Sequence, residues 1–229
     1  MKTRSIMQNA EIKISEIFYS IQGEGLLAGR PSVFIRLAGC PLRCKFCDTN
    51  YALDSSAGKK MTIAEIKEQV KKYKPKYIVI TGGEPMISPD LPLLCKSLKN
   101  FHITIETSGI KFLPRLKCNL MSIGPKLSNA YLKKSDKKRY LKIDHLKKLI
   151  KEYDYQLKFV VEKAKDIAEV KQIIEEIKTV DCSKVLLMPQ AKNLSQYLNR
   201  SPLVARLCKE NGFTFSPRLQ LVFGEIKPV

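Results

Sequence analysis

The chain has 229 residues and a formal net charge of +19, with 41 Lys and Arg against 22 Asp and Glu, and it contains seven cysteines. This length suits one domain, and no apolar run is long enough to span a membrane, so we expect a single domain over residues 1–229. The seven cysteines, the size and the lack of a secretory signal argue against a disulfide framework.

The first patterned segment, residues 16–25, ends in Gln22-Gly23-Glu24-Gly25. Considered alone, such a glycine-flanked polar run is typical of a surface turn. A strand is predicted at 33–38, where five of the six residues are apolar. This strand runs directly into a cysteine-rich loop, which is therefore expected to emerge from the end of a rigid element.

Cys40, Cys44 and Cys47 form a C-x3-C-x2-C motif in the loop 39–49. Three thiolates on one loop can hold three irons of a four-iron cluster, and the fourth iron then stays open to a small molecule. A structural zinc site is the alternative, but zinc sites favour C-x2-C pairs, and the rest of the chain offers no such second half. The remaining cysteines lie in apolar segments and are predicted to be small core side chains: Cys95, Cys118, Cys182 and Cys208.

A second motif, Thr81-Gly82-Gly83-Glu84-Pro85, follows an apolar run at 77–80 that predicts a buried strand. Two adjacent glycines allow a ligand to approach the backbone closely. The Glu84 carboxylate can accept a charge-assisted hydrogen bond from an ammonium group. An ordinary turn after a strand is the alternative interpretation of this motif.

Along the rest of the chain, apolar runs alternate with amphipathic stretches. Helices are predicted at 62–74 (with Thr62 as the cap), 89–99, 144–153, 166–179 and 194–210. Strands are predicted at 76–81, 102–106, 119–123, 155–161, 184–188 and around 213–223, with 218–223 as a closing strand. The charged segment 133–139 is predicted to be a solvated loop. Repeated strand–helix units imply a parallel sheet with helices outside and an active site at the carboxyl ends of its strands.

The cysteine motif resembles the signature of the radical S-adenosylmethionine (radical SAM) superfamily, whose members bind SAM on the open iron of a 4Fe-4S cluster. The Gly-Gly-Glu-Pro turn is similar to that superfamily's site for the SAM amino group. Residues 16–25 resemble the F-x-S-x-Q-G-E-G element of 7-carboxy-7-deazaguanine synthases, with matching spacing to Arg36, Cys40 and Thr49. The resemblance implies an α/β fold, an incomplete (modified TIM-like) parallel barrel of the radical SAM type.

Members of this family convert 6-carboxy-5,6,7,8-tetrahydropterin to 7-carboxy-7-deazaguanine with loss of ammonia, in the biosynthesis of 7-deazapurine tRNA bases (the queuosine and archaeosine pathways). The resemblance therefore implies a carbon–nitrogen lyase that uses a reduced 4Fe-4S cluster, SAM and Mg²⁺. In such an enzyme the cofactor carries the difficult step, and the protein supplies positioning and electrostatics. A homodimer and an electron donor of the flavodoxin or ferredoxin type are also implied.

The matching positions imply a set of site residues. Arg36 offers a planar fork for the substrate carboxylate, and Thr49 offers a hydroxyl to Mg²⁺ beside the substrate's own oxygens. Substrate-binding roles are implied for an N-terminal element at 16–36 and two later positions: Ile21, Gln22, Gly23, Arg36, Thr107 and Pro228. SAM-binding roles are implied for Phe46, Cys47, Asp48, Gly83, Glu84, Gly109, Gly124, Pro125, Lys126, Met188, Pro189, Gln190 and Ala191.

Two SAM-binding segments depart from the family's patterns. Gly124 stands where the S-P-K element has serine, so only backbone contact is expected there. Met188 and Ala191 stand where a Q-P-x-D element has polar side chains. Both departures remove polar groups from the part of the SAM site distal to the cluster.

Two other functions fit part of the sequence. A glycyl-radical-enzyme activase shares the cysteine spacing but lacks the N-terminal element. A non-catalytic, metal-containing tRNA-binding protein would account for the positive charge. The lysines, however, are spread along helices without aromatic interleaving, so we expect a solvated surface and no direct nucleic-acid binding. The same charge would favour an acidic electron donor and a carboxylated substrate.

Overall fold

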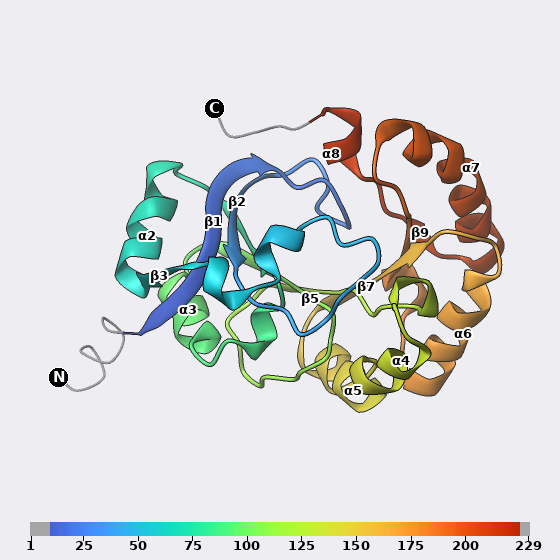
Figure 1. Ribbon diagram of the computed structural model, residues 1–229, viewed down its shortest axis with the longest axis horizontal. Coiled ribbons are helices and arrows are strands. Elements are labelled where there is room, and N and C mark those ends of the chain that lie inside the picture. Colours follow the sequence, from blue (N-terminus) through green and yellow to red (C-terminus); the bar gives the residue numbers. More distant parts are fainter. Residues whose placement is uncertain (1–9, 225–229) are drawn as a thin grey trace.

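Helices surround a curved sheet in the computed structural model, which describes residues 10–224 (Figure 1). The sheet has nine strands in the order β3-β1-β2-β4-β5-β6-β7-β8-β9. Its two edge strands, β3 and β9, do not pair with each other, so the barrel is open. The expected α/β fold with an incomplete barrel is confirmed.

The strands are β1 (Glu11–Ile21), β2 (Pro31–Leu37), β3 (Lys59–Thr62), β4 (Tyr77–Gly82), β5 (His102–Thr107), β6 (Leu120–Ile123), β7 (Tyr155–Val161), β8 (Val185–Pro189) and β9 (Thr214–Phe215). The α-helices are α2 (Ile63–Lys72), α3 (Leu91–Ser97), α4 (Lys134–Tyr140), α5 (Ile143–Glu152), α6 (Asp166–Ile177), α7 (Leu194–Asn211) and α8 (Leu219–Val222). Short 3-10 helices are η1 (Asn50–Ala52), η2 (Ser55–Ala57), η3 (Pro85–Ile87), η4 (Ser128–Ala130) and η5 (Cys182–Lys184).

Most of the predicted elements are confirmed, with boundaries that differ by a few residues. The apolar runs form β2, β4, β5, β6, β7 and β8, which pair in parallel because each strand is followed by a crossover on the outside of the sheet. The predicted cap of α2 is also confirmed. Thr62 accepts from the Glu65 backbone N–H at 3.2 Å, and Glu65 accepts from the Thr62 N–H at 2.7 Å, a reciprocal capping box.

Three predictions about elements are wrong. The sheet is mixed, since β1 runs antiparallel to both β2 and β3, and neither β1 nor β3 was predicted as a strand. The closing strand at 218–223 is instead the short helix α8. The segment 133–139 is mostly helical, as α4, and its first turn is capped by Asp136, which accepts from the Lys133 N–H at 3.3 Å.

The cysteines outside the motif differ in burial. Cys95 and Cys208 are buried, and Cys118 packs against the core, as predicted. Cys182 is exposed, so its assignment to the core is wrong. It lies in η5, a solvent-facing turn before β8.

The two faces of the sheet differ in chemistry. Buried side chains such as Ile80 and Ile105 join the apolar core. The alternate residues include polar ones that bond to one another from strand to strand: Thr81 donates to Glu106 at 2.9 Å, and Gln156 donates to Ser122 at 2.7 Å. Because side chains alternate along a strand, one face of the sheet can pack on helices while the other lines a polar interior.

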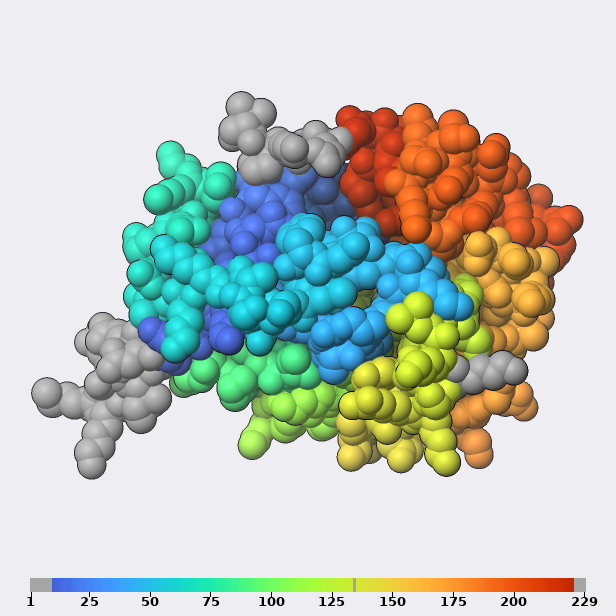
Figure 2. All heavy atoms as spheres, in the orientation of Figure 1, coloured from blue at the N-terminus to red at the C-terminus, as the bar shows by residue number. Residues whose placement is uncertain are grey.

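The segment after β2 lies across the middle of one face of the molecule, between the N-terminal strands and the C-terminal half (Figure 2). This segment contains the cysteine motif, so the motif sits over the sheet at the carboxyl end of β2. Within the described residues, no helix is both long and apolar enough to cross a membrane.

Candidate functional site

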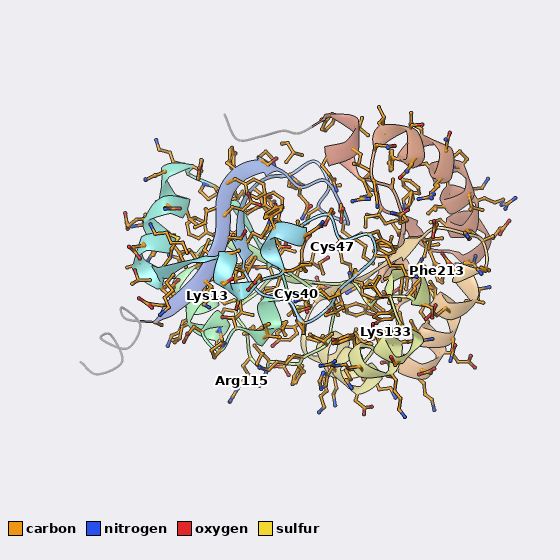
Figure 3. All side chains as sticks on the ribbon, viewed as in Figure 1. Lys13, Cys40, Cys47, Arg115, Lys133 and Phe213 are labelled. Carbon is orange, nitrogen blue, oxygen red and sulfur yellow. The ribbon has the colours of Figure 1, made fainter. Side chains whose placement is uncertain are left out.

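The cysteine loop is fixed at both ends by backbone hydrogen bonds. Gly39 N–H donates to the Ala52 carbonyl at 2.8 Å, and Cys40 N–H donates to the Leu53 carbonyl at 3.0 Å. Figure 3 shows Cys40 and Cys47 near the centre of the view, on the loop that follows β2. The loop therefore starts and ends at the same place on the sheet, and its three thiols are presented together.

The three thiols suit an iron–sulfur cluster by their chemistry. All are free and partly buried, and burial raises the pKa of Cys40 to about 11 and raises that of Cys44. Burial therefore favours the protonated form of Cys40 and Cys44 until a cation beside them favours the thiolate. Among residues 10–224, no three Cys, His, Asp or Glu side chains are gathered around a point that could hold one metal ion. A four-iron cluster instead spreads its thiolates over separate irons.

The Gly-Gly-Glu turn packs directly on the cysteine loop. A Cβ on Gly83 would lie 2.1 Å from the Gly39 carbonyl oxygen, so only glycine fits there. Two backbone hydrogen bonds of 2.9 Å join the segments: Gly83 N–H donates to Leu37, and Glu84 N–H donates to Gly39. The carboxyl ends of β2 and β4 are thereby locked together.

The Glu84 carboxylate is buried, with 2% of the residue exposed. It accepts hydrogen bonds from the Thr107 hydroxyl at 2.6 Å, the Ser108 N–H at 2.8 Å, the Ser108 hydroxyl at 2.5 Å and the Met86 N–H at 3.1 Å. Thr107 in turn accepts from the Gly109 N–H at 3.0 Å. The end of β5 therefore holds the glutamate in one orientation beside the cysteine loop.

The next segment of the implied SAM site begins at Gly124, whose N–H donates to the Thr107 carbonyl at 2.7 Å. A Cβ on Gly124 would meet nothing closer than 3.6 Å, so the glycine is not required by packing. Pro125 is buried and Lys126 is partly buried. The structure thus brings Glu84, Thr107 and Gly124 together across three neighbouring strands.

The last implied SAM segment lies at the end of β8 and is buried from Met188 to Ala191. The Gln190 side chain and backbone carbonyl both accept from Arg200, the carbonyl at 2.6 Å. The Ala191 carbonyl accepts from Arg218. Arg200 and Arg218 therefore already occupy acceptors of this segment.

The N-terminal motif enters the same interior. Gln22 is buried, and its amide donates to Glu106 at 3.2 Å. The Gly23 carbonyl accepts from the Leu219 N–H at 3.0 Å, which brings α8 against the motif. Ile21 ends β1, where it pairs with Pro31.

Arg36 lies on β2 and is already paired. Its Nε donates to Glu16 at 2.6 Å, and its guanidinium lies 5.6 Å from the centre of the Phe18 ring. Thr49 has its hydroxyl 3.8 Å from the Cys47 sulfur. Phe46 is partly exposed and Asp48 is exposed. Pro228 lies outside the described residues.

The sequence-based analysis missed a buried ionic network. Lys158 on β7 donates to Glu24 at 2.5 Å and lies 3.9 Å from Glu106. Arg218 donates to Glu24 at 3.3 Å and to Asp48 at 3.1 Å. Arg218 therefore joins the Q-G-E-G motif to the cysteine loop, through Glu24 on one side and Asp48 on the other.

The network keeps Glu24 and Lys158 ionised. Burial alone would raise the pKa of Glu24, but Lys158 and Arg218 lower it to about 2. Burial would lower the pKa of Lys158, but Glu24 and Glu106 raise it. Lys158 lies two residues after Gln156 and therefore on the same, polar face of β7.

Comparisons with known proteins agree with the geometry. The radical SAM superfamily model matches residues 34–189. A 7-carboxy-7-deazaguanine synthase from Rhodopirellula baltica is 36% identical over 93% of this chain and 86% of the relative. One from Halobacterium salinarum is 34% identical over 95% and 92%. The crystal structure of QueE from Escherichia coli has a similar fold, with a TM-score of 0.68 at 23% identity over 94% of this chain and 97% of that one.

Membership of the radical SAM superfamily implies a 4Fe-4S cluster and SAM. The loop of three free thiols suits the cluster, and the buried Glu84 carboxylate beside it offers an acceptor to an ammonium group. The family model and the two relatives each cover more than two thirds of the chain or of the relative. The chain therefore belongs to the 7-carboxy-7-deazaguanine synthase family of the radical SAM superfamily.

Proposed function

We propose that this protein converts 6-carboxy-5,6,7,8-tetrahydropterin to 7-carboxy-7-deazaguanine with loss of ammonia, as a radical SAM carbon–nitrogen lyase. The observation that carries the proposal is the contact of the Q-G-E-G motif with the cysteine loop through Arg218, which bonds both Glu24 and Asp48. A substrate element and a cofactor element that share one interior support a reaction between substrate and cofactor.

The cluster would be held by Cys40, Cys44 and Cys47, and, when bound, cluster and SAM supply radical hydrogen abstraction. Glu84 accepts the SAM ammonium in exchange for some of its present donors, a charge-assisted bond in a site with little water. The neighbouring SAM contacts are Phe46, Asp48, Gly83, Gly109, Gly124, Pro125, Lys126, Met188, Pro189, Gln190 and Ala191.

On the substrate side, the Gln22 side chain and the backbone of Ile21 and Gly23 form hydrogen bonds with the polar edge of the pterin ring. Arg36 binds the carboxylate, because a guanidinium matches a carboxylate with two parallel hydrogen bonds. Thr107 contacts both the substrate and Glu84. Thr49 binds Mg²⁺ only with oxygens from the substrate, since one hydroxyl alone is a weak site for a hard cation.

The working protein is a cytoplasmic homodimer that receives electrons from a flavodoxin or ferredoxin. A glycyl-radical activase is less favoured because it has no use for the Q-G-E-G motif that closes on the interior. A non-catalytic tRNA-binding protein is less favoured because the polar, charge-balanced interior would then serve no ligand.

The test is anaerobic reconstitution with iron and sulfide, followed by SAM, dithionite and 6-carboxytetrahydropterin, with and without Mg²⁺. Mass spectrometry should detect 7-carboxy-7-deazaguanine from the wild-type chain and none from Cys40→Ala. Cys182→Ala is the matched control, because this exposed thiol lies away from the motif, and it should keep full activity.

Cleavage of SAM without a deazapurine product would contradict the substrate. Failure to cleave SAM at all would contradict the reaction class. An activase would remain active when Arg36 is replaced by Ala, whereas the pterin enzyme should lose most of its activity.

A further inference from the structure

Glu16 faces Arg36 because of an irregularity in the β1–β2 pairing. Ile14 pairs with Leu37, but the next pair is Glu16 with Arg36, so Ser15 is an extra residue on β1. Such a bulge changes which side chain faces a given partner, and bulges are common next to functional sites. Without the extra residue, the position opposite Arg36 would hold Ser15.

The Glu16 carboxylate binds two groups with the same oxygen. Oε1 accepts from Arg36 Nε at 2.6 Å and from the Tyr51 hydroxyl at 2.7 Å. Tyr51 lies in η1, four residues after Cys47, so its hydroxyl fastens the cysteine loop to β1.

The Arg36 guanidinium is held on a second side by aromatic packing. It lies 5.6 Å from the Phe18 ring centre, and Phe18 is itself stacked on Phe34 with ring centres 4.9 Å apart. Only 14% of the Arg36 side chain is exposed. In residues 10–224, Arg36 has no hydrogen-bond acceptor at either terminal nitrogen, NH1 or NH2.

We propose that Glu16 and Tyr51 are positioning residues that hold Arg36 by its Nε, so that its NH1 and NH2 edge is ready for the carboxylate of the substrate. This inference rests on the proposed function, in which Arg36 binds that carboxylate. A guanidinium that is already fixed loses less side-chain freedom when it binds a ligand, and the affinity rises accordingly.

Glu16 also carries a charge that repels a substrate carboxylate, and the two effects have opposite signs. Glu16→Ala removes both the support and the repulsion, whereas Glu16→Gln removes the charge and keeps an acceptor for Arg36 and Tyr51. Tyr51→Phe removes one donor and leaves the Glu16 charge in place. The three variants therefore separate orientation from electrostatics.

The experiment compares steady-state kinetics of the reconstituted wild type and these variants with 6-carboxytetrahydropterin. Glu16→Ala and Tyr51→Phe should raise KM by about 2- to 10-fold, the effect of one immobilised side chain, while kcat changes less than about twofold. The KM of Glu16→Gln should lie between those of the wild type and Glu16→Ala. Tyr19→Phe is the control, because Tyr19 lies on the same strand and stacks on Tyr73 away from Arg36.

A second measurement does not depend on turnover. The midpoint of thermal unfolding, Tm, of each variant before reconstitution should be close to that of the wild type. A KM that is unchanged or lower in Glu16→Ala would overturn the proposal. Glu16 would then either have no effect on substrate binding or weaken it by repelling the substrate carboxylate. A fall in kcat with KM unchanged would also overturn it. A wild-type chain that makes no product would overturn the proposed function and this inference together, whereas wild-type-like kinetics in the variants would overturn only the inference.

Discussion

Gly124 replaces a serine of the family pattern at a position with space for a side chain. Its Cβ would meet Lys126 Nζ and the Lys158 carbonyl at 3.6 Å, which are ordinary contacts. We therefore expect Gly124→Ser to fold normally and to regain a hydrogen bond to SAM. One net hydrogen bond should lower the Kd of SAM by about 2- to 10-fold. Equilibrium binding of SAM to the anaerobically reconstituted protein measures this Kd. A higher Kd in Gly124→Ser than in the wild type would mean that SAM does not contact this position.

Gly83 contrasts with Gly124, because its Cβ would lie 2.1 Å from the backbone oxygen of Gly39. Gly83→Ala must separate the Gly-Gly-Glu turn from the cysteine loop and should lower the free energy of unfolding by about 1–3 kcal/mol. It should also lower the iron content after reconstitution, measured by iron analysis.

Gly124→Ala is the matched control for this change, since it adds the same methyl group where there is room. Its stability and iron content should equal those of the wild type. Equal iron content in Gly83→Ala would mean that the cysteine loop does not depend on this contact.

Arg218 matters at the scale of elements, because it ties the N-terminal motif, the cysteine loop and the end of β8 to the chain before α8. Its side chain is 8% exposed and bonds Glu24, Asp48 and the Ala191 carbonyl. Arg218→Met leaves a buried carboxylate with one cation fewer, so the free energy of unfolding should fall by about 3–5 kcal/mol. Urea denaturation measures this change.

Arg206→Met serves as the control, because the Arg206 side chain is 63% exposed in its ion pair with Glu210, one turn further along α7. An exposed pair contributes about 0–1 kcal/mol, so this variant should be close to the wild type. If both variants lost stability equally, burial of the Arg218 network would not be the cause.

The elements that the sequence predicted correctly have a local signal. Continuous apolar runs marked β4 and β8, and Thr62 with Glu65 marked the start of α2. The segment at 218–223 has no comparable local signal. Its alternating pattern suits a strand, but it forms a short helix whose Leu219 N–H donates to the Gly23 carbonyl, a residue near the other end of the chain. Tertiary contacts of this kind decide between helix and strand in short segments.

The site shows the same division. Cys40, Cys44, Cys47 and Glu84 were predicted because their motifs are contiguous, and the structure brings their segments into contact through Gly83. Lys158 and Arg218 were missed because each is a lone cation in a chain of 41 Lys and Arg. Their partner Glu24 is 134 and 194 residues away, so nothing local distinguishes them from surface charges.

For the whole molecule, the buried Lys158 and Arg218 find their counter-ions inside the barrel, although the chain carries a net charge of +19. Lys158 faces Glu24 and Glu106, and Arg218 bonds Glu24 and Asp48, so each of these cations has two carboxylate partners. The excess lysines are therefore left to the surface. Since buried charges must be paired to be stable, the stability of the barrel depends on the ionisation of Glu24 and Lys158.

This dependence predicts how stability responds to acid. The folded pKa of Glu24 is about 2, below its ordinary 4.5. A lowered pKa stabilises the fold above the unfolded value, so this contribution, about 3 kcal/mol, should be complete above pH 4.5 and should disappear as the pH falls toward 2. Lys158 has a pKa raised by Glu24 and Glu106, so raising the pH weakens its contribution only in the alkaline range.

The comparison of wild type with Glu24→Gln isolates this group. Denaturant unfolding at neutral pH should show the variant less stable by about 3–5 kcal/mol, because Lys158 and Arg218 lose their shared anion. The difference should narrow steadily below pH 4.5, as the wild type becomes protonated at the same carboxyl. Glu210→Gln changes an exposed position of α7. Its free energy of unfolding should follow that of the wild type at every pH. A difference in stability between wild type and Glu24→Gln that stays constant from pH 7 to about pH 2.5 would mean that packing, and not the charge on Glu24, stabilises this part of the barrel.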